Sequence, residues 1–336
     1  MNRLIAYIFA PFVFLCPIAV LAQNDTQFDP PRNEHGHPDF QGNWTNRLAT
    51  PYQRPVDLGE RATYSAEEAA QFQNSAQDER ARSLAPLDPN RPAPNSEDGV
   101  DQSAEDIFTP DVLDLLVIEG EVRTSVITDP PNGRIPFRAD AHQKDYYAQL
   151  RSLGLGRYDG PEVMYATPRC LSIWGPLPPL RGRPPETPNF KIVQTKTHLV
   201  FYQELGGTTR IIKLNGNTLP ANIPQWHGDS VGYWDNDTLV VETNNFSPLN
   251  SNPQILVSDE FSAREEFRII SDYEIFYRFT ITDPVMYSSP FSGELVLKRM
   301  PHGERIFEFA CHEGNHSITG ILAGARRQEM DNARGY

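Results

Sequence analysis

The chain has 336 residues, of which 44 are acidic and 30 are Lys or Arg, and its formal net charge at pH 7 is −14. Proline accounts for 30 residues, which is roughly twice its usual share of ~5%, and proline disrupts helix interiors and central strands. The 39% hydrophobic composition excludes a polytopic membrane protein, and the proline content argues against a helical bundle. The dispersed acidic charge argues against nucleic acid or an anionic membrane surface as a partner.

The first 22 residues have the pattern of a cleavable secretory signal. Arg3 precedes an apolar run that ends in small residues at Ala22. A transmembrane anchor is the alternative, but Pro11 and Pro17 interrupt the run. We therefore expect cleavage near Ala22, a periplasmic or secreted bacterial protein, and no integral membrane segment after cleavage.

Residues 23–120 are polar and rich in proline, which predicts an arm with short helices laid over the main domain. The capping-box spacing of Ser65 and Glu68 predicts a helix over 66–82. Thr109 followed by a proline predicts a short helix over 110–116. The intervening 86–104 segment has little to bury and is expected to form a surface loop.

The remaining residues, 121–336, are expected to form an antiparallel β-barrel domain. A helix over 142–152 ends before Gly154, and a proline-rich connection then leads into segments of period-two alternation. No helix long enough for a parallel crossover separates these segments, so we predict a mainly β fold, an antiparallel meander closed into a β-barrel. The predicted strands are 190–195, 199–204, 210–214, 238–244, 255–262, 265–270, 274–282, 293–299 and 305–312.

Alternation assigns the two faces of each predicted strand. In 305–312 and its predicted neighbours the apolar residues share one face, and Cys311 lies on it with Phe307 and Phe309. The opposite face, which carries Glu308 and His312, is either exposed to solvent or the wall of a polar cavity. The sequence leaves both alternatives open.

Only two cysteines follow the predicted signal, Cys170 and Cys311. In an oxidising compartment an even pair predicts a disulfide. The alternative is a reactive thiol at Cys311 activated by His312, but adjacent strand residues point to opposite faces and are poor catalytic partners.

The element Gly42-Asn43-Trp44 is similar to the G-x-W of lipocalin-like barrels, where the tryptophan closes one barrel end. Together with five further motifs in the same order, it makes the chain resemble a large family of secreted bacterial proteins of unknown function. The resemblance covers most of the mature chain and implies no particular activity, and His227 departs from the aliphatic residue expected at its position. The five motifs are Arg123-Thr124-Ser125 with Asp129-Pro130-Pro131-Asn132-Gly133-Arg134, Pro168-Arg169-Cys170, Trp226–Trp234, Asp237–Thr243 and Cys311–Asn315.

Two polar clusters are the candidate site. A histidine oriented by a carboxylate is the usual general base near neutral pH, so we expect a metal-independent site with His312 or His227 as the base and Asp229 or Glu313 as the orienting group. The alternative is structural, with these side chains capping turns or satisfying loop amides. The expected ligand-binding residues are Trp226, Ser230, Trp234, Asn315 and His316.

Other chemistries fit the sequence less well. His227, His312, His316 and Glu313 could ligate zinc, but their spacing is not the helical H-E-x-x-H pattern. Ser230 stands in a G-x-S-x-G-like frame whose context is a hairpin rather than a strand–elbow–helix. No nucleotide-binding glycine motif occurs, so we expect no cofactor.

These observations favour a lyase, isomerase or hydrolase that acts by acid–base catalysis on a small organic or sugar-like molecule in a barrel cavity. A non-catalytic binding or carrier protein is the alternative, and a structural envelope component is a third possibility. The side chains inside the barrel would discriminate among them.

Overall fold

A computed structural model describes residues 28–83, 86, 90, 114–172, 178–180 and 189–334. The predicted signal over 1–22, most of the predicted 86–104 loop and the first part of the predicted 110–116 helix lie outside the described residues. The described end of that helix, at Leu116, is buried and not helical. Among the helices of the described ranges, none has the length and apolar composition needed to cross a membrane.

Short strands and helices form the N-terminal half of the chain, a run of longer strands follows, and a helix ends the described part. The strands are β1 (Gly42–Thr45), β2 (Val117–Ile118), β3 (Glu121–Val122), β4 (Ile127–Asp129), β5 (Asn189–Gln194), β6 (His198–Gln203), β7 (Thr208–Leu214), β8 (Asp229–Asp235), β9 (Thr238–Asn244), β10 (Ser262–Ser271), β11 (Glu274–Thr282) and β12 (Phe291–Arg299). The helices are α1 (Ala66–Ser83), α2 (Ala141–Lys144), α3 (Tyr146–Ser152) and α4 (His316–Arg334), with short 3-10 turns η1 (Val56–Leu58), η4 (Pro161–Val163), η5 (Thr167–Arg169) and η6 (Pro248–Asn250).

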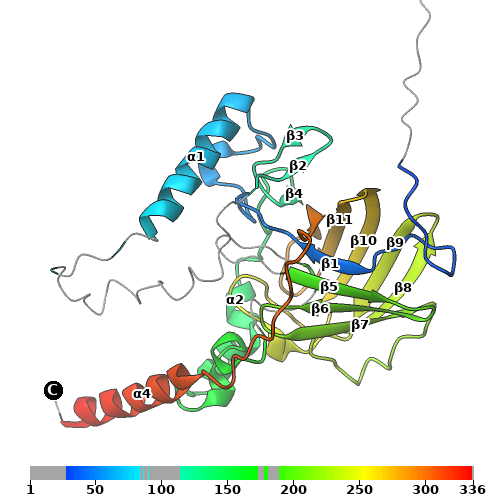
Figure 1. Cartoon of the computed structure of the whole chain (residues 1–336). Coiled ribbons are helices and arrows are strands. Elements are labelled where there is room, and N and C mark those ends of the chain that lie inside the picture. Colours follow the sequence, from blue (N-terminus) through cyan, green and yellow to red (C-terminus); the bar gives the residue numbers. More distant parts are fainter. Residues whose placement is uncertain are drawn as a thin grey trace, which may run out of the picture.

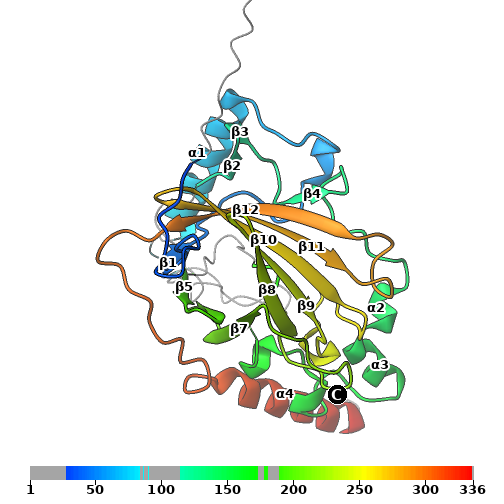
Figure 2. The same ribbon diagram turned by 90° about the vertical axis from the view of Figure 1, so that its right-hand side faces the viewer.

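The predicted barrel is confirmed. In the described part of the chain, nine strands pair in the order β1-β5-β6-β7-β8-β9-β10-β11-β12, and β1 pairs with β12 to close the ring (Figure 2). β4 extends the sheet beyond β12. α1 lies beside β2 and β3, away from the barrel strands (Figure 1).

Two features of the predicted topology are wrong. β7 and β8 run parallel, because the non-helical connection over 215–228 returns the chain to the same barrel end before β8 starts. The predicted strand 305–312 is irregular, and 255–262 forms no strand before Ser262, where β10 begins. β1, from the segment expected to be an arm, pairs with both β5 and β12, so the position beside β12 that a last strand would occupy is already filled.

The predictions for the helices are confirmed only in part. Ser65 and Glu68 cap α1 reciprocally, since the Glu68 N–H donates to Ser65 Oγ at 3.2 Å and the Ser65 N–H donates to Glu68 Oε2 at 2.9 Å. The predicted 142–152 helix is divided into α2 and α3 at Asp145. α4 was not predicted, because Gly320 and Gly324 interrupt its sequence.

Aromatic side chains fill the middle of the barrel. Phe201 on β6 contacts Phe267 on β10 across the interior, with ring centroids 5.2 Å apart, and Phe267 contacts Tyr277 at 4.8 Å. All three are buried. At this level the described residues form a packed core rather than an open lumen.

One barrel end is closed by apolar and aromatic side chains around the G-x-W element. Phe40 and His37 pack on Trp234, and the Trp44 Nε1–H donates to the Phe40 carbonyl at 2.9 Å. The Arg299 guanidinium lies over the Trp44 ring, 4.2 Å from its centroid. Gly42 adopts a φ of +142°, which residues with a side chain rarely adopt, so glycine is favoured there.

Candidate functional site

A cavity of about 450 Å³ lies at the other end of the barrel, around the β6–β7 hairpin. It is bounded by the hairpin, by the segment before β8, by the disulfide and by the tail that connects β12 to α4. The lining residues are Cys170, Leu171, Tyr202, Gly206, Gly207, Thr208, Thr209, His227, Glu308, Phe309 and His312. We call this space the rim cavity.

The disulfide forms one wall of the rim cavity. Cys170 and Cys311 are bonded, with their Cα atoms 5.7 Å apart, as predicted. The alternative of a reactive thiol at Cys311 is wrong, because its sulfur is in this bond. Cys170 follows η5 in a left-handed conformation with φ of 55°, which turns the chain toward the tail.

Hydrogen bonds hold the tail across the barrel end. The Phe307 N–H donates to Glu204 Oε1 at 2.6 Å, and Asn189 Nδ2 donates to Glu204 Oε2 at 2.6 Å. Asn315 Nδ2 donates to the Pro168 carbonyl at 3.0 Å. Figure 1 shows the tail, in orange, passing the ends of β5, β6 and β7 before α4 begins.

His227 and His312 line the same cavity although 85 positions separate them in the sequence. His312 is exposed on the tail, and among the described residues no carboxylate forms an ion pair with it. Glu308, which sequence reasoning did not select, lies on the same wall. It occupies an exposed position in the segment that was predicted to be a strand.

His227 is held in a defined protonation state. Asn250 is fully buried, and its Nδ2 donates to the Trp226 carbonyl at 2.7 Å. This bond identifies the atom as the amide nitrogen, which can only donate hydrogen bonds. The same Nδ2 lies 3.2 Å from His227 Nδ1, which must therefore accept. Burial, together with the nearby Arg210 guanidinium, lowers the pKa of His227 to about 4. At neutral pH the imidazole is uncharged with its proton on Nε2.

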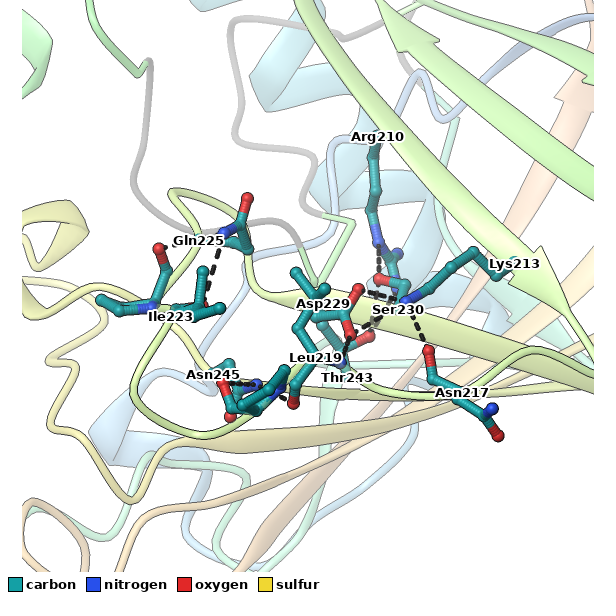
Figure 3. Close-up of polar contacts among 12 residues, drawn as sticks. Arg210, Lys213, Asn217, Leu219, Ile223, Gln225, Asp229, Ser230, Thr243 and Asn245 are labelled. Atoms are coloured by element: carbon teal, nitrogen blue, oxygen red, sulfur yellow. Dashed lines mark hydrogen bonds and ion pairs between the residues drawn. The ribbon is translucent and has the colours of Figure 1, made fainter.

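Asp229 does not line the rim cavity. Its carboxylate accepts from Lys213 Nζ at 2.8 Å and from the Leu219 N–H at 2.5 Å (Figure 3). These contacts fasten the 215–228 connection to β7 and β8. The structural interpretation of Asp229 is therefore the better one, and its predicted role in orienting a catalytic histidine has no support in the geometry.

Ser230 points to the opposite side of β8, into the barrel, because side chains alternate along a strand. Its Oγ accepts from Arg210 Nε at 2.9 Å and lies 3.0 Å from Thr243 Oγ1 (Figure 3). The preceding Gly228 packs closely against β9, where a Cβ would lie 2.6 Å from Thr243 Cγ2. Ser230 thus belongs to a buried network rather than to the rim cavity.

The buried network centres on an ion pair that sequence reasoning missed. Arg210 Nη1 donates to Glu265 Oε1 at 3.0 Å, and Nη2 pairs with Oε2 and donates to Thr243 Oγ1 at 2.8 Å. The Tyr277 hydroxyl donates to Glu265 Oε1 at 2.9 Å and accepts from the Leu180 N–H at 3.0 Å. Burial raises the pKa of Tyr277 well above its usual value, and the Glu265 charge adds to this. Strand alternation could have indicated that this pair is buried, because Arg210 and Glu265 stand at the same alternate positions as the buried apolar residues of their strands.

The two tryptophans predicted to flank a ligand lie at opposite ends of β8. Trp234 packs against His37 and Phe40 at the closed barrel end, whereas Trp226 precedes β8 at the open end. The intervening strand is seven residues long, or about 23 Å at ~3.3 Å per residue. The structure therefore does not bring the two tryptophans together around one cavity.

The remaining predicted residues lie around the start of α4. Asn315 caps this helix, since its Oδ1 accepts from the Ile318 N–H at 3.4 Å and from the Ser317 hydroxyl at 2.9 Å. His316 is the first helical residue, and Glu313 is exposed in the preceding turn. Neither Asn315, His316 nor Glu313 lines the rim cavity.

We compared the chain with protein-family models and with curated proteins, and neither comparison gave a match. The resemblance to secreted bacterial proteins therefore stays a prediction. Within the described ranges, no group of three or more His, Cys, Asp or Glu side chains is arranged to hold a metal ion. The four residues considered for zinc do not form such a group there.

Proposed function

We propose that the rim cavity binds a small polar organic molecule and that His312 transfers a proton on it, in a reaction of lyase or isomerase type. The observation that carries this proposal is the convergence of His227, His312 and Glu308 on one cavity. A volume of about 450 Å³ is within the range typical of small-molecule sites, ~300–1,000 Å³. Imidazole is the side chain best suited to exchange protons near neutral pH.

The two histidines have different roles in this proposal. His312, on the exposed tail, takes a proton from a carbon of the bound molecule. His227 is neutral, because its pKa of about 4 lies well below 7. With Nδ1 accepting from Asn250, a neutral His227 is suited to donate from Nε2 to an oxygen that gains negative charge. The proton then returns at a second position, or a leaving group departs.

The proposed location is the periplasm or the exterior of a bacterial cell. The Cys170–Cys311 bond supports this proposal, because structural disulfides persist in oxidising compartments. The pattern of residues 1–22 supports it independently.

Binding without chemistry is the second candidate. It is favoured by the missing ion pair at His312 in the described part of the chain, since an orienting carboxylate usually accompanies a catalytic histidine. This candidate uses the same cavity and differs only in turnover.

Deuterium exchange separates the two candidates. Small hydroxy acids, keto acids and sugars are incubated with the protein in D₂O, and ¹H NMR follows the loss of C–H signals. We expect the wild-type protein to exchange a C–H of at least one compound and His312→Ala to slow that exchange by about 10²-fold or more. Because His312 is exposed, its replacement should leave the thermal midpoint unchanged.

His302→Ala is the matched control, because this exposed histidine lies on the same tail but does not line the rim cavity. It should exchange the compound at the wild-type rate. Saturable binding with no exchange by the wild-type protein would support the carrier function. Equal exchange by the wild-type protein and His312→Ala would contradict the assignment of the base.

A further inference from the structure

A second cavity, of about 430 Å³, adjoins the rim cavity and shares Tyr202 with it. The strand register explains this arrangement. On adjacent strands β1, β5, β6 and β7, Asn43 pairs with Lys191, Lys191 with Tyr202, and Tyr202 with Thr209. The four side chains therefore form one row across the outer face of these strands. Asn43, Lys191 and Tyr202 line the second cavity, and Tyr202 and Thr209 line the rim cavity.

The tail crosses this row and completes both cavities. Arg305 and Ile306 line the second cavity, whereas Glu308, Phe309 and His312 line the rim cavity. Between the two groups, the Phe307 N–H donates to Glu204 at the end of β6. We call the row and the two adjoining cavities the track. Lys191 and Arg305 line the cavity at one end, and the two histidines line the cavity at the other.

Lys191 and Arg305 are cations that line this track. Within the described residues, neither Lys191 nor Arg305 takes part in an ion pair, although the chain carries an excess of acidic residues. Other cations near the barrel are neutralised, as Lys213 is by Asp229 and Lys298 by Asp114. Two uncompensated cations facing one cavity make it attractive to a small anion.

We propose that Lys191 and Arg305 hold an anionic group of the substrate, a carboxylate or a phosphate, while the rest of the molecule extends past Tyr202 toward His312. This inference rests on the proposed function for the identity of the bound molecule as a substrate. Two strand spacings, about 10 Å at ~4.8 Å per spacing, separate Lys191 from Thr209, which lines the rim cavity, so a small molecule can reach from one cavity into the other. The substrate is therefore a small organic acid or a phosphorylated compound rather than a neutral sugar.

Inorganic phosphate and succinate are the probes for this site. Backbone amide shifts of Lys191 and Tyr202 are followed by NMR as each anion is added. We expect saturable shifts with at least one anion, and affinity that falls roughly tenfold in Lys191→Gln and again in Arg305→Gln. Rising salt should also weaken binding. Binding of phosphate alone would indicate a phosphate group on the substrate, and binding of succinate alone would indicate a carboxylate. Binding of both would indicate a site that accepts either anion.

Lys196→Gln is the matched control, because this exposed lysine lies in the turn between β5 and β6 and does not line either cavity. It should bind as the wild-type protein does. The proposal is overturned if neither anion shifts the two amides, or if Lys191→Gln and Arg305→Gln retain wild-type affinity.

His312→Ala separates this inference from the proposed function. It should bind the anion with wild-type affinity, because His312 lies at the other end of the track. Anion binding without C–H exchange of any compound would contradict the proposed function but support the anion site. Exchange of a neutral compound without anion binding would do the reverse.

Discussion

Replacing Glu265 by Gln should lower the free energy of unfolding by about 3–5 kcal/mol, as for other buried pairs that lose one partner. Both side chains of the pair are almost fully buried, with 2% of Arg210 and none of Glu265 exposed. The substitution keeps the shape but leaves the Arg210 charge without its counter-ion. Urea unfolding followed by circular dichroism measures the change.

Glu266→Gln is the control for this substitution. Glu266 neighbours Glu265 on β10 but faces outward and pairs with Arg264 at a partly exposed position. It should cost no more than about 1 kcal/mol. Replacing both members of the buried pair, as Arg210→Met with Glu265→Met, should recover part of the loss, because no charge then remains buried. Equal stability of Glu265→Gln and Glu266→Gln would show that the network does not stabilise the barrel.

Breaking the disulfide should have the second large effect. The bond joins residues 141 positions apart, and the chain-entropy relation gives roughly 5 kcal/mol for a loop of this length. It also forms a wall of the rim cavity and holds the tail that carries His312. We expect Cys170→Ser with Cys311→Ser to lose several kcal/mol of stability and most of the C–H exchange.

The single variants supply the control for the disulfide. Either substitution removes the same bond, so Cys170→Ser, Cys311→Ser and the double variant should lose similar stability rather than additive amounts. Reduction of the wild-type protein should have the same effect. Unchanged stability and exchange after reduction would contradict the role given to this bond.

The barrel could be predicted because its signal is local. Residues 274–282 alternate strictly and become β11, and Asn236 adopts a φ of 53° in the turn between β8 and β9, as its residue type favours. The tail over 305–312 also places Phe307, Phe309 and Cys311 at alternate positions but is irregular. Strand formation requires a partner, and the edge of β12 opposite β11 is already paired with β1 and β4.

The rim cavity could be predicted only in part, because it joins segments that are far apart in the chain. His227 and His312 were selected by residue type and do line one cavity. Asp229 was selected for the same reason, but its partner Lys213 became a neighbour only through the parallel pairing of β7 and β8. Lys191 and Arg305 carry no local signal, since their proximity depends on the path of the tail.

The most direct test of the shared cavity is an imidazole ¹⁵N NMR titration of histidine-labelled protein with the compound that exchanges in D₂O. His227 and His312 signals should move together and give the same dissociation constant, while His302 stays unchanged. In the free protein His227 should stay neutral until the pH falls to about 4, with its proton on Nε2. Movement of only one of the two cavity histidines at saturation would contradict a common site.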